Sequence, residues 1–179
     1  MEYFVTADLH LDHANIIEYT HRPFRDVDQM NKTIIHNWNE RIKKEDVVYH
    51  LGDFCFRGGK EGGLTKADWW ASQLNGKIIH LKGNHDSNNG VKTIITHLMA
   101  EFADKVILMQ HIPPMHPAEI PAFVDVVLCG HVHDLWKVRY IGDVPLINVG
   151  TDQWNFYPVK LIEIIVFLDS LERSSWSNK

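Results

Sequence analysis

The segment Tyr3-Phe4-Val5-Thr6-Ala7-Asp8-Leu9-His10 shows the pattern that decides the fold of this 179-residue chain: an apolar, β-branched run and then a short polar cluster. The pattern recurs four more times. The later apolar runs are residues 47–51, 77–81, 106–109 and 126–129. The polar clusters that follow them are Gly52-Asp53, Gly83-Asn84-His85-Asp86, His111 and Gly130-His131-Val132-His133. In an open α/β sheet, such residues project from the carboxyl ends of strands, where these folds place their binding sites.

Side chains with nitrogen or oxygen donors are expected to converge at this edge. They are Asp8, His10, Asp53, Asn84, His111, His131 and His133. This set is too large for one tetrahedral metal ion and fits two ions that share one carboxylate. Imidazole and carboxylate ligands without thiolates suit Mn, Fe, Zn, Ni or Co, and they argue against an iron–sulfur cluster. The sequence therefore predicts a centre with two divalent metal ions.

Segments with helical spacing separate the strands in the first half of the chain. Asp26 followed by Gln29 predicts a helix start, and apolar residues then recur at spacings of three and four. Thr65 with Asp68 predicts a second helix, and the apolar residues within 91–98 predict a third. The resulting β-α-β-α-β order requires parallel strands with right-handed crossovers. The predicted fold class is α/β.

The second half of the chain shows closely spaced strands instead. They are expected at residues 105–110, 125–129, 136–140, 146–149 and 159–165. We expect one domain over residues 1–173, because no linker divides the chain, and a disordered tail over 174–179. His50 and His80 lie within strand runs and are expected to be hydrogen-bonded core or sheet residues.

Composition limits the classes of partner. The formal net charge of −5 and the pI near 6.2 provide no basic surface for extended nucleic acid. We expect no membrane association, because no apolar stretch approaches the roughly 20 residues that span a bilayer. Met1-Glu2 leads directly into a strand run, so we expect no signal peptide. Cys55 and Cys129 do not make a disulfide framework, and a cytoplasmic protein with reduced thiols is expected.

The five motifs in their order resemble those of the calcineurin-like metallophosphoesterases: Asp-x-His, Gly-Asp, Gly-Asn-His-Asp, a lone His and Gly-His-x-His. The resemblance covers residues 3–165, nearly the whole chain. Residues 8–24, with Asn15-Ile16-Ile17 and Arg22-Pro23-Phe24, further resemble a compact bacterial and phage branch, as do residues 148–158. The resemblance implies a four-layer αββα sandwich, in which two mixed β-sheets are flanked by helices.

The resemblance also implies roles for the polar side chains. Asp53 would bridge two metal ions, and Mn²⁺ is the favoured ion. The ligands of one ion would be Asp8, His10 and His133, and those of the other Asn84, His111 and His131. Two such ions can hold a hydroxide that attacks a phosphoryl group. His85 would face the substrate and assist the leaving group as a general acid or a charged donor.

The carboxylate that orients His85 is left open by the sequence. In larger phosphatases of the family, a Tyr-Val-Asp-Arg-Gly sequence supplies it, but this chain has Phe56 at the corresponding position, with Arg57 in register with the phosphate-binding arginine. Either Asp86 takes over this role, or His85 works with a less perturbed pKa. The candidate substrate contacts are His13, Arg22 and Arg57.

The predicted function is hydrolysis of a small phosphate ester. A phosphodiester is favoured, because an open site with few cationic groups suits a monoanionic diester better than a dianionic monoester. The alternatives are a phosphomonoesterase, a nuclease that acts on DNA or RNA ends, and a non-catalytic metal-binding scaffold. The low pI counts against the nuclease, and the complete set of ligand residues with His85 counts against the scaffold. The sequence does not indicate an oligomeric state.

Overall fold

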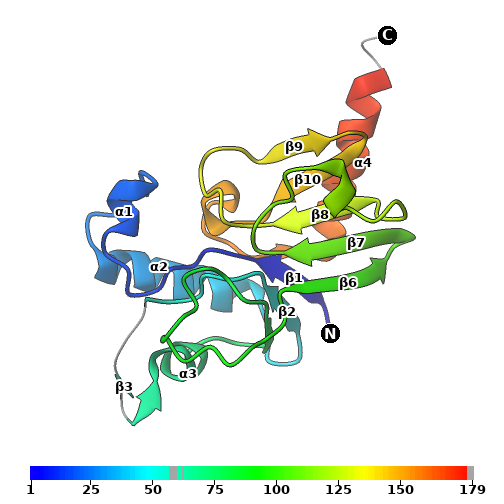
Figure 1. Cartoon of the computed structure of the whole chain (residues 1–179). Helices are drawn as coiled ribbons and strands as arrows, with labels where there is room; N and C mark the ends of the chain where they lie inside the picture. Colours follow the sequence, from blue (N-terminus) through cyan, green and yellow to red (C-terminus); the bar gives the residue numbers. More distant parts are fainter. Residues whose placement is uncertain (57–59, 62, 177–179) are drawn as a thin grey trace.

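Two mixed β-sheets lie at the centre of the computed structural model, which describes residues 1–56, 60–61 and 63–176 (Figure 1). The strand order in the first sheet is β11 (Val159–Lys160), β1 (Tyr3–Thr6), β2 (Val47–His50) and β5 (Lys77–His80). The order in the second is β6 (His97–Phe102), β7 (Lys105–Gln110), β8 (Val126–Cys129), β10 (Val144–Asn148) and β9 (Val138–Ile141). A separate two-stranded hairpin contains β3 (Lys60–Glu61) and β4 (Leu64–Thr65).

Parallel pairing aligns the carboxyl ends of the central strands. In the first sheet β1, β2 and β5 run parallel, with Thr6 opposite His50 and His50 opposite His80. In the second sheet β7, β8 and β10 run parallel, with Leu128 opposite both Met109 and Ile147. The edge strands β11, β6 and β9 pair antiparallel. In each sheet, the loops after the three parallel strands therefore leave at one edge.

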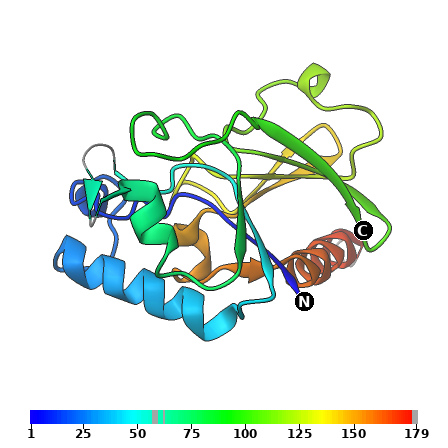
Figure 2. The same cartoon turned by 90° about the horizontal axis from the view of Figure 1, so that it is seen from below.

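Helices flank this pair of sheets. The helices are α1 (Ile16–Tyr19), α2 (Val27–Arg41), α3 (Lys66–Ala71) and α4 (Leu161–Trp176), with 3-10 turns η1 (Pro117–Glu119) and η2 (Thr151–Trp154). Helices α2 and α3 cover the outer face of the first sheet (Figure 2), where Trp38 packs in one cluster with Phe4. Helix α2 begins where predicted, since the Asp26 carboxylate accepts a hydrogen bond from the backbone N–H of Gln29 (2.8 Å).

The main core lies between the two sheets and beside α4. Alternation along β1 sends Phe4 outward to α2 and Val5 inward, where Val5 shares a cluster with Met109 and Leu128. Ile164 of α4 joins the same cluster. The predicted sandwich of two mixed sheets flanked by helices is confirmed. The outer face of the second sheet is covered by the 112–125 segment with its η1 turn, which contributes two residues, Ile120 and Val124, to a third apolar cluster.

Two predicted elements were wrong. Residues 91–98 do not form a helix: Ile94 is 95% exposed, and the segment from His97 pairs with β7 through six residue pairs. Pairing with a distant strand outweighs the local three- and four-residue spacing. The strand expected over 159–165 ends at Lys160 and continues as α4, because the apolar residues that follow also occur at helical spacing.

Helix α4 also includes residues 174–176, which the sequence analysis assigned to a disordered tail, and residues 177–179 lie outside the described residues. The single-domain organisation stays a prediction. Of the helices in the described ranges, none combines the length and the apolar character that crossing a bilayer requires.

His50 and His80 are indeed sheet residues, but the side chain of His50 is not hydrogen-bonded. It is fully buried, and neither ring nitrogen has a hydrogen-bond partner among the described residues. Its ring lies 5.5 Å from that of His80 and 5.1 Å from that of Phe54. Burial, with a further contribution from His80, holds the pKa of His50 well below its ordinary value, so the imidazole is a neutral core group.

Candidate metal centre and active site

The side chains predicted as metal ligands follow the ends of five parallel strands. Strands β1, β2, β5, β7 and β8 are followed by Asp8 and His10, by Asp53, by Asn84, by His111, and by His131 and His133 respectively. Five of these residues, Asp8, His10, Asp53, His131 and His133, have left-handed φ angles of 57°, 50°, 58°, 70° and 45°. Such conformations cost about 1–3 kcal/mol each in non-glycine residues and persist where the surroundings enforce them, often at functional sites.

Asp53 lies at the centre of the group. Its Oδ2 is 3.5 Å from His10 Nε2 and 3.3 Å from His111 Nε2. Asn84 Oδ1 in turn lies 2.8 Å from His111 Nε2 and 2.9 Å from His131 Nδ1. The Asp53 carboxylate therefore stands between a histidine of each predicted ligand set.

The donor atoms fit divalent metal ions. Ligand atoms of Asp8, His10 and His133 lie within 4.8 Å of one another, as do those of Asp8, Asp53 and His111. Asp53 Oδ2 and His10 Nε2 are buried, yet neither has a hydrogen-bond partner among the described residues. Buried polar atoms are nearly always paired, so two such atoms that face each other fit a cation bound between them. The number and identity of the ions remain predictions.

Two glycines allow the backbone to approach these carboxylates. A Cβ atom on Gly83 would collide with Asp53 Oδ1 and with the Asp53 backbone nitrogen, and one on Gly130 would collide with Asp8 Oδ2. The backbone N–H of His131, next to Gly130, donates to both oxygens of Asp8 (3.1 and 2.9 Å). The glycines in the Gly-Asn-His-Asp and Gly-His-x-His motifs are thus required by close packing against the ligands.

Burial and neighbouring charges both shift the pKa values of the predicted ligands. Burial raises the pKa of Asp8 to about 6, although His111 and His133 oppose this. Burial lowers the pKa of His111, but the Asp53 carboxylate, 3.3 Å from its Nε2, and the charge of Asp8 outweigh this and raise the pKa to about 9. Burial holds the pKa of His10 well below its ordinary value. The negative potential that stabilises a proton on His111 would equally favour a metal cation.

Neighbouring acceptors orient two of the histidines. His111 Nδ1 lies 2.8 Å from the carbonyl oxygen of Leu51, and His133 Nδ1 lies 3.2 Å from Asp152 Oδ2. A hydrogen bond at Nδ1 leaves Nε2 as the available ligand atom, as is usual for metal-binding histidines. Asp152 was missed by the sequence analysis, although it follows the end of β10 in the way the other polar residues follow their strands.

The Arg22 guanidinium is engaged within the protein, and its role as a substrate contact stays a prediction. Its side chain is buried and forms a two-pronged ion pair with Asp152 (Nε–Oδ1 2.8 Å, Nη2–Oδ2 3.0 Å). It also donates to the backbone oxygens of Asp8 (2.7 Å) and Leu9 (3.0 Å). The guanidinium therefore fixes the loop after β1 and the carboxylate that orients His133.

The Asp86 carboxylate is surrounded by backbone donors. Its buried carboxylate accepts hydrogen bonds from the backbone N–H groups of Asp53 (2.8 Å), Phe54 (3.0 Å) and Gly83 (2.9 Å), and from the Asn89 side chain (2.8 Å). Within the described residues, no hydrogen bond joins it to the His85 ring. Asp86 holds together the loops after β2 and β5.

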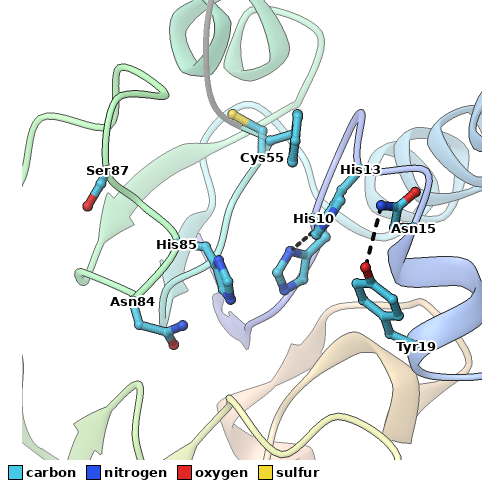
Figure 3. Close-up of a pocket in the computed structure, with 9 residues that line it drawn as sticks. His10, His13, Asn15, Tyr19, Cys55, Asn84, His85 and Ser87 are labelled. Atoms are coloured by element: carbon cyan, nitrogen blue, oxygen red, sulfur yellow. Dashed lines mark hydrogen bonds between the residues drawn. The ribbon is translucent and has the colours of Figure 1, made fainter.

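His85 and His13 lie next to the metal ligands. The backbone N–H of His85 donates to Asp53 Oδ1 (2.8 Å), and its ring centre is 5.6 Å from that of His10. His13 Nδ1 is 3.2 Å from His10 Nδ1. Both histidines line an open pocket of about 400 Å³ (Figure 3). Arg57, the third predicted substrate contact, lies outside the described residues.

Comparisons with known proteins agree with this geometry. The family model described as the calcineurin-like phosphoesterase superfamily domain matches residues 1–161. An uncharacterised protein of Methanocaldococcus jannaschii is 31% identical over 173 residues, which cover 93% of this chain and 90% of that protein. The gene 66 protein of Mycobacterium phage L5 is 27% identical over 144 residues, or 77% of this chain and 63% of the phage protein.

A solved structure shares the fold. The crystal structure of a protein of unknown function from Aquifex aeolicus superposes with a TM-score of 0.71 at 23% identity and covers 93% of this chain and 98% of its own. The family match over nine-tenths of the sequence includes every strand that carries a predicted ligand. The chain therefore belongs to the calcineurin-like phosphoesterase superfamily and is a metal-dependent phosphoric ester hydrolase.

Proposed function

We propose that this protein hydrolyses a small phosphodiester at a centre of two divalent metal ions. One ion would be held by Asp8, His10 and His133 and the other by Asn84, His111 and His131, with Asp53 available to both. The observation that carries the proposal is the buried Asp53 Oδ2, which lies between histidines of the two sets and has no hydrogen-bond partner in the part of the chain that the structure describes. Mn²⁺ is the favoured ion, with Fe, Zn, Ni and Co as alternatives.

When bound, such ions supply Lewis-acid activation of the phosphoryl group and of the attacking water. The residues of the chain then have separate tasks. The negative charges of Asp8 and Asp53 draw cations into a largely buried site. His85, which is exposed at the pocket and tied to Asp53 only through its backbone, donates a proton to the leaving-group oxygen as the phosphorus–oxygen bond breaks.

A diester is favoured over a monoester by the charge of the pocket. The described residues that line the pocket include no lysine or arginine. A dianionic monoester would therefore find no cationic side chain among these described residues, whereas a diester carries one negative charge less. The net charge of −5 likewise disfavours extended nucleic acid as a substrate. The cytoplasmic location stays a prediction.

Metal analysis tests the proposal most directly. The purified protein should bind two Mn²⁺ ions per chain in isothermal titration calorimetry. Hydrolysis of methyl p-nitrophenyl phosphate should stop in excess chelator and return when Mn²⁺ is added. The matched variant Asp53→Asn should bind less metal and lose most activity, whereas Asp143→Asn, which removes an exposed charge in the β9–β10 turn, should do neither. Saturation at one ion, or full activity in chelator, would contradict the two-ion centre.

A further inference from the structure

The pocket beside the candidate metal centre has an aromatic wall. The ring of His13 stacks on that of Phe56, with centres 4.7 Å apart and an angle of 29° between the planes. The Tyr19 ring meets His13 edge-on at 6.4 Å. Tyr19 and Phe56 are 66% and 41% exposed, so much of their surface faces solvent rather than the core. Exposed aromatic side chains in a shared pocket are typical of a binding surface.

The wall lies next to the reacting groups. Tyr19 and His13 come from the segment after β1, and Asn84 and His85 come from the loop after β5 (Figure 3). His10, a predicted metal ligand, lines the same pocket. A substrate whose phosphate reaches the metal ligands therefore has the aromatic wall within the same 400 Å³ space.

The chemistry of the lining is neutral. Its described residues include no Lys, Arg, Asp or Glu, and its polar groups are amides, hydroxyls, a thiol and imidazoles. The Asn15 amide lies 3.5 Å from the Tyr19 hydroxyl, and Ser87 is a lining residue on the side opposite Asn15 and Tyr19 (Figure 3). Phe56 adds an exposed apolar ring face to this lining. Such a surface suits an uncharged, planar ring with polar edges.

We propose that Tyr19, His13 and Phe56 form a subsite that stacks a nucleobase of the diester substrate. The inference rests on the proposed function and narrows it to nucleoside phosphodiesters. Stacking of a base on an aromatic side chain is sequence-tolerant, because every base presents a π-face. The subsite would therefore select a nucleoside over an alkyl group without selecting strongly among bases.

Two diesters with the same leaving group test the subsite in the Mn²⁺-loaded protein. These are thymidine 5′-(p-nitrophenyl phosphate) and methyl p-nitrophenyl phosphate. The wild-type kcat/KM should be about tenfold or more higher for the thymidine ester, the size expected for one stacked base. Tyr19→Ala and Phe56→Ala should reduce this preference by about tenfold, mainly through KM. Tyr140→Ala, which removes an exposed ring on β9 outside the pocket, should leave it unchanged.

A binding measurement keeps the subsite testable apart from catalysis. Calorimetry with thymidine 5′-monophosphate and deoxyribose 5-phosphate compares ligands that differ only in the base. The nucleotide should bind about tenfold more tightly, and Tyr19→Ala should remove the difference. Equal affinities in the wild type, with unchanged preference in both alanine variants, would overturn the subsite even if both diesters are cleaved. Failure to cleave either diester, with the base still favouring binding, would instead overturn the proposed function.

Discussion

At the scale of single residues, the two oxygens of Asp53 have different surroundings. Oδ1 accepts the backbone N–H of His85 at 2.8 Å, whereas Oδ2 faces the imidazoles of His10 and His111. One carboxylate thus fixes the loop that carries His85 and supplies the oxygen for metal. The His85 ring has no such restraint from Asp86, whose oxygens are taken by three backbone N–H groups and Asn89. His85 can therefore be removed with little expected change in the metal ligands.

Replacement of His85 tests its role as a proton donor. His85→Ala should leave metal binding unchanged and slow turnover by roughly 10²–10⁴-fold for a diester with an alkoxide leaving group. A p-nitrophenyl diester should be affected much less, because its leaving group needs little protonation. Calorimetry with Mn²⁺ and steady-state rates for both substrates measure this. Equal slowing of both substrates would indicate charge stabilisation, and wild-type rates on both would exclude any catalytic part for His85.

The convergence of the predicted ligands could be read from the sequence because each follows a strand, and parallel strands end at one edge. Arg22 and Asp86 could not be read in this way. Both side chains are charged, as catalytic or substrate-binding residues often are. In the structure they instead form hydrogen bonds with backbone groups of the loops that carry the predicted metal ligands. Tyr19 and Phe56 gave no signal either, since a single exposed aromatic residue, at the end of the four-residue helix α1 or in a loop, follows no periodicity. The local sequence pattern thus identifies residues at the carboxyl edge of the sheets. Only tertiary contacts show whether such a side chain faces the site or binds backbone groups of the loops.

At the scale of elements, a helix or strand can be predicted from sequence when the residues that determine it lie within its own segment. Helix α2 has its N-cap at Asp26 and its apolar face within one segment, and it was predicted correctly. Strand β6 is determined by its antiparallel partner β7, and its own sequence indicated a helix. The 159–168 run is apolar at both strand and helix spacing, so the end of β11 at Lys160 could not be read from it.

The η2 turn couples two elements that carry predicted ligands, which leads to a prediction for Asp152. Asp152 accepts hydrogen bonds from Arg22, which lies between α1 and α2. Its Oδ2 also lies 3.2 Å from Nδ1 of His133, in the loop after β8. Asp152→Asn removes the charge that orients His133, so affinity for one metal ion should fall by about 10–100-fold. Raised Mn²⁺ should restore much of the activity. Chelator competition measures the affinity, and Asp143→Asn in the β9–β10 turn controls for the lost charge. Equal affinities in the two variants would show that Asp152 has no such role.

At the scale of the whole molecule, the metal centre forms where two sheets meet. Neither sheet alone contains a complete predicted set: Asp53 and His10 come from the first, and His111 and His133 from the second. The apolar cluster between the sheets sets their separation, since Val5 of one sheet packs with Met109 and Leu128 of the other. Losing the fold therefore means losing the site, and conditions that unfold the core should release metal.

Acid should destabilise the fold through His50. In the folded state burial holds its pKa well below 6.5, so the imidazole stays neutral as pH falls. The unfolded chain binds a proton below about pH 6.5, so the free energy of unfolding decreases as pH falls through that value, by up to about 1.4 kcal/mol per pH unit. Urea unfolding of the metal-free protein between pH 7.5 and 5 should show this decrease. His50→Gln, which cannot titrate, should show a shallower decrease whatever its stability at neutral pH, while His36→Gln at an exposed position of α2 should keep the wild-type slope. Parallel curves for His50→Gln and wild type would show that the buried imidazole does not cause the acid sensitivity.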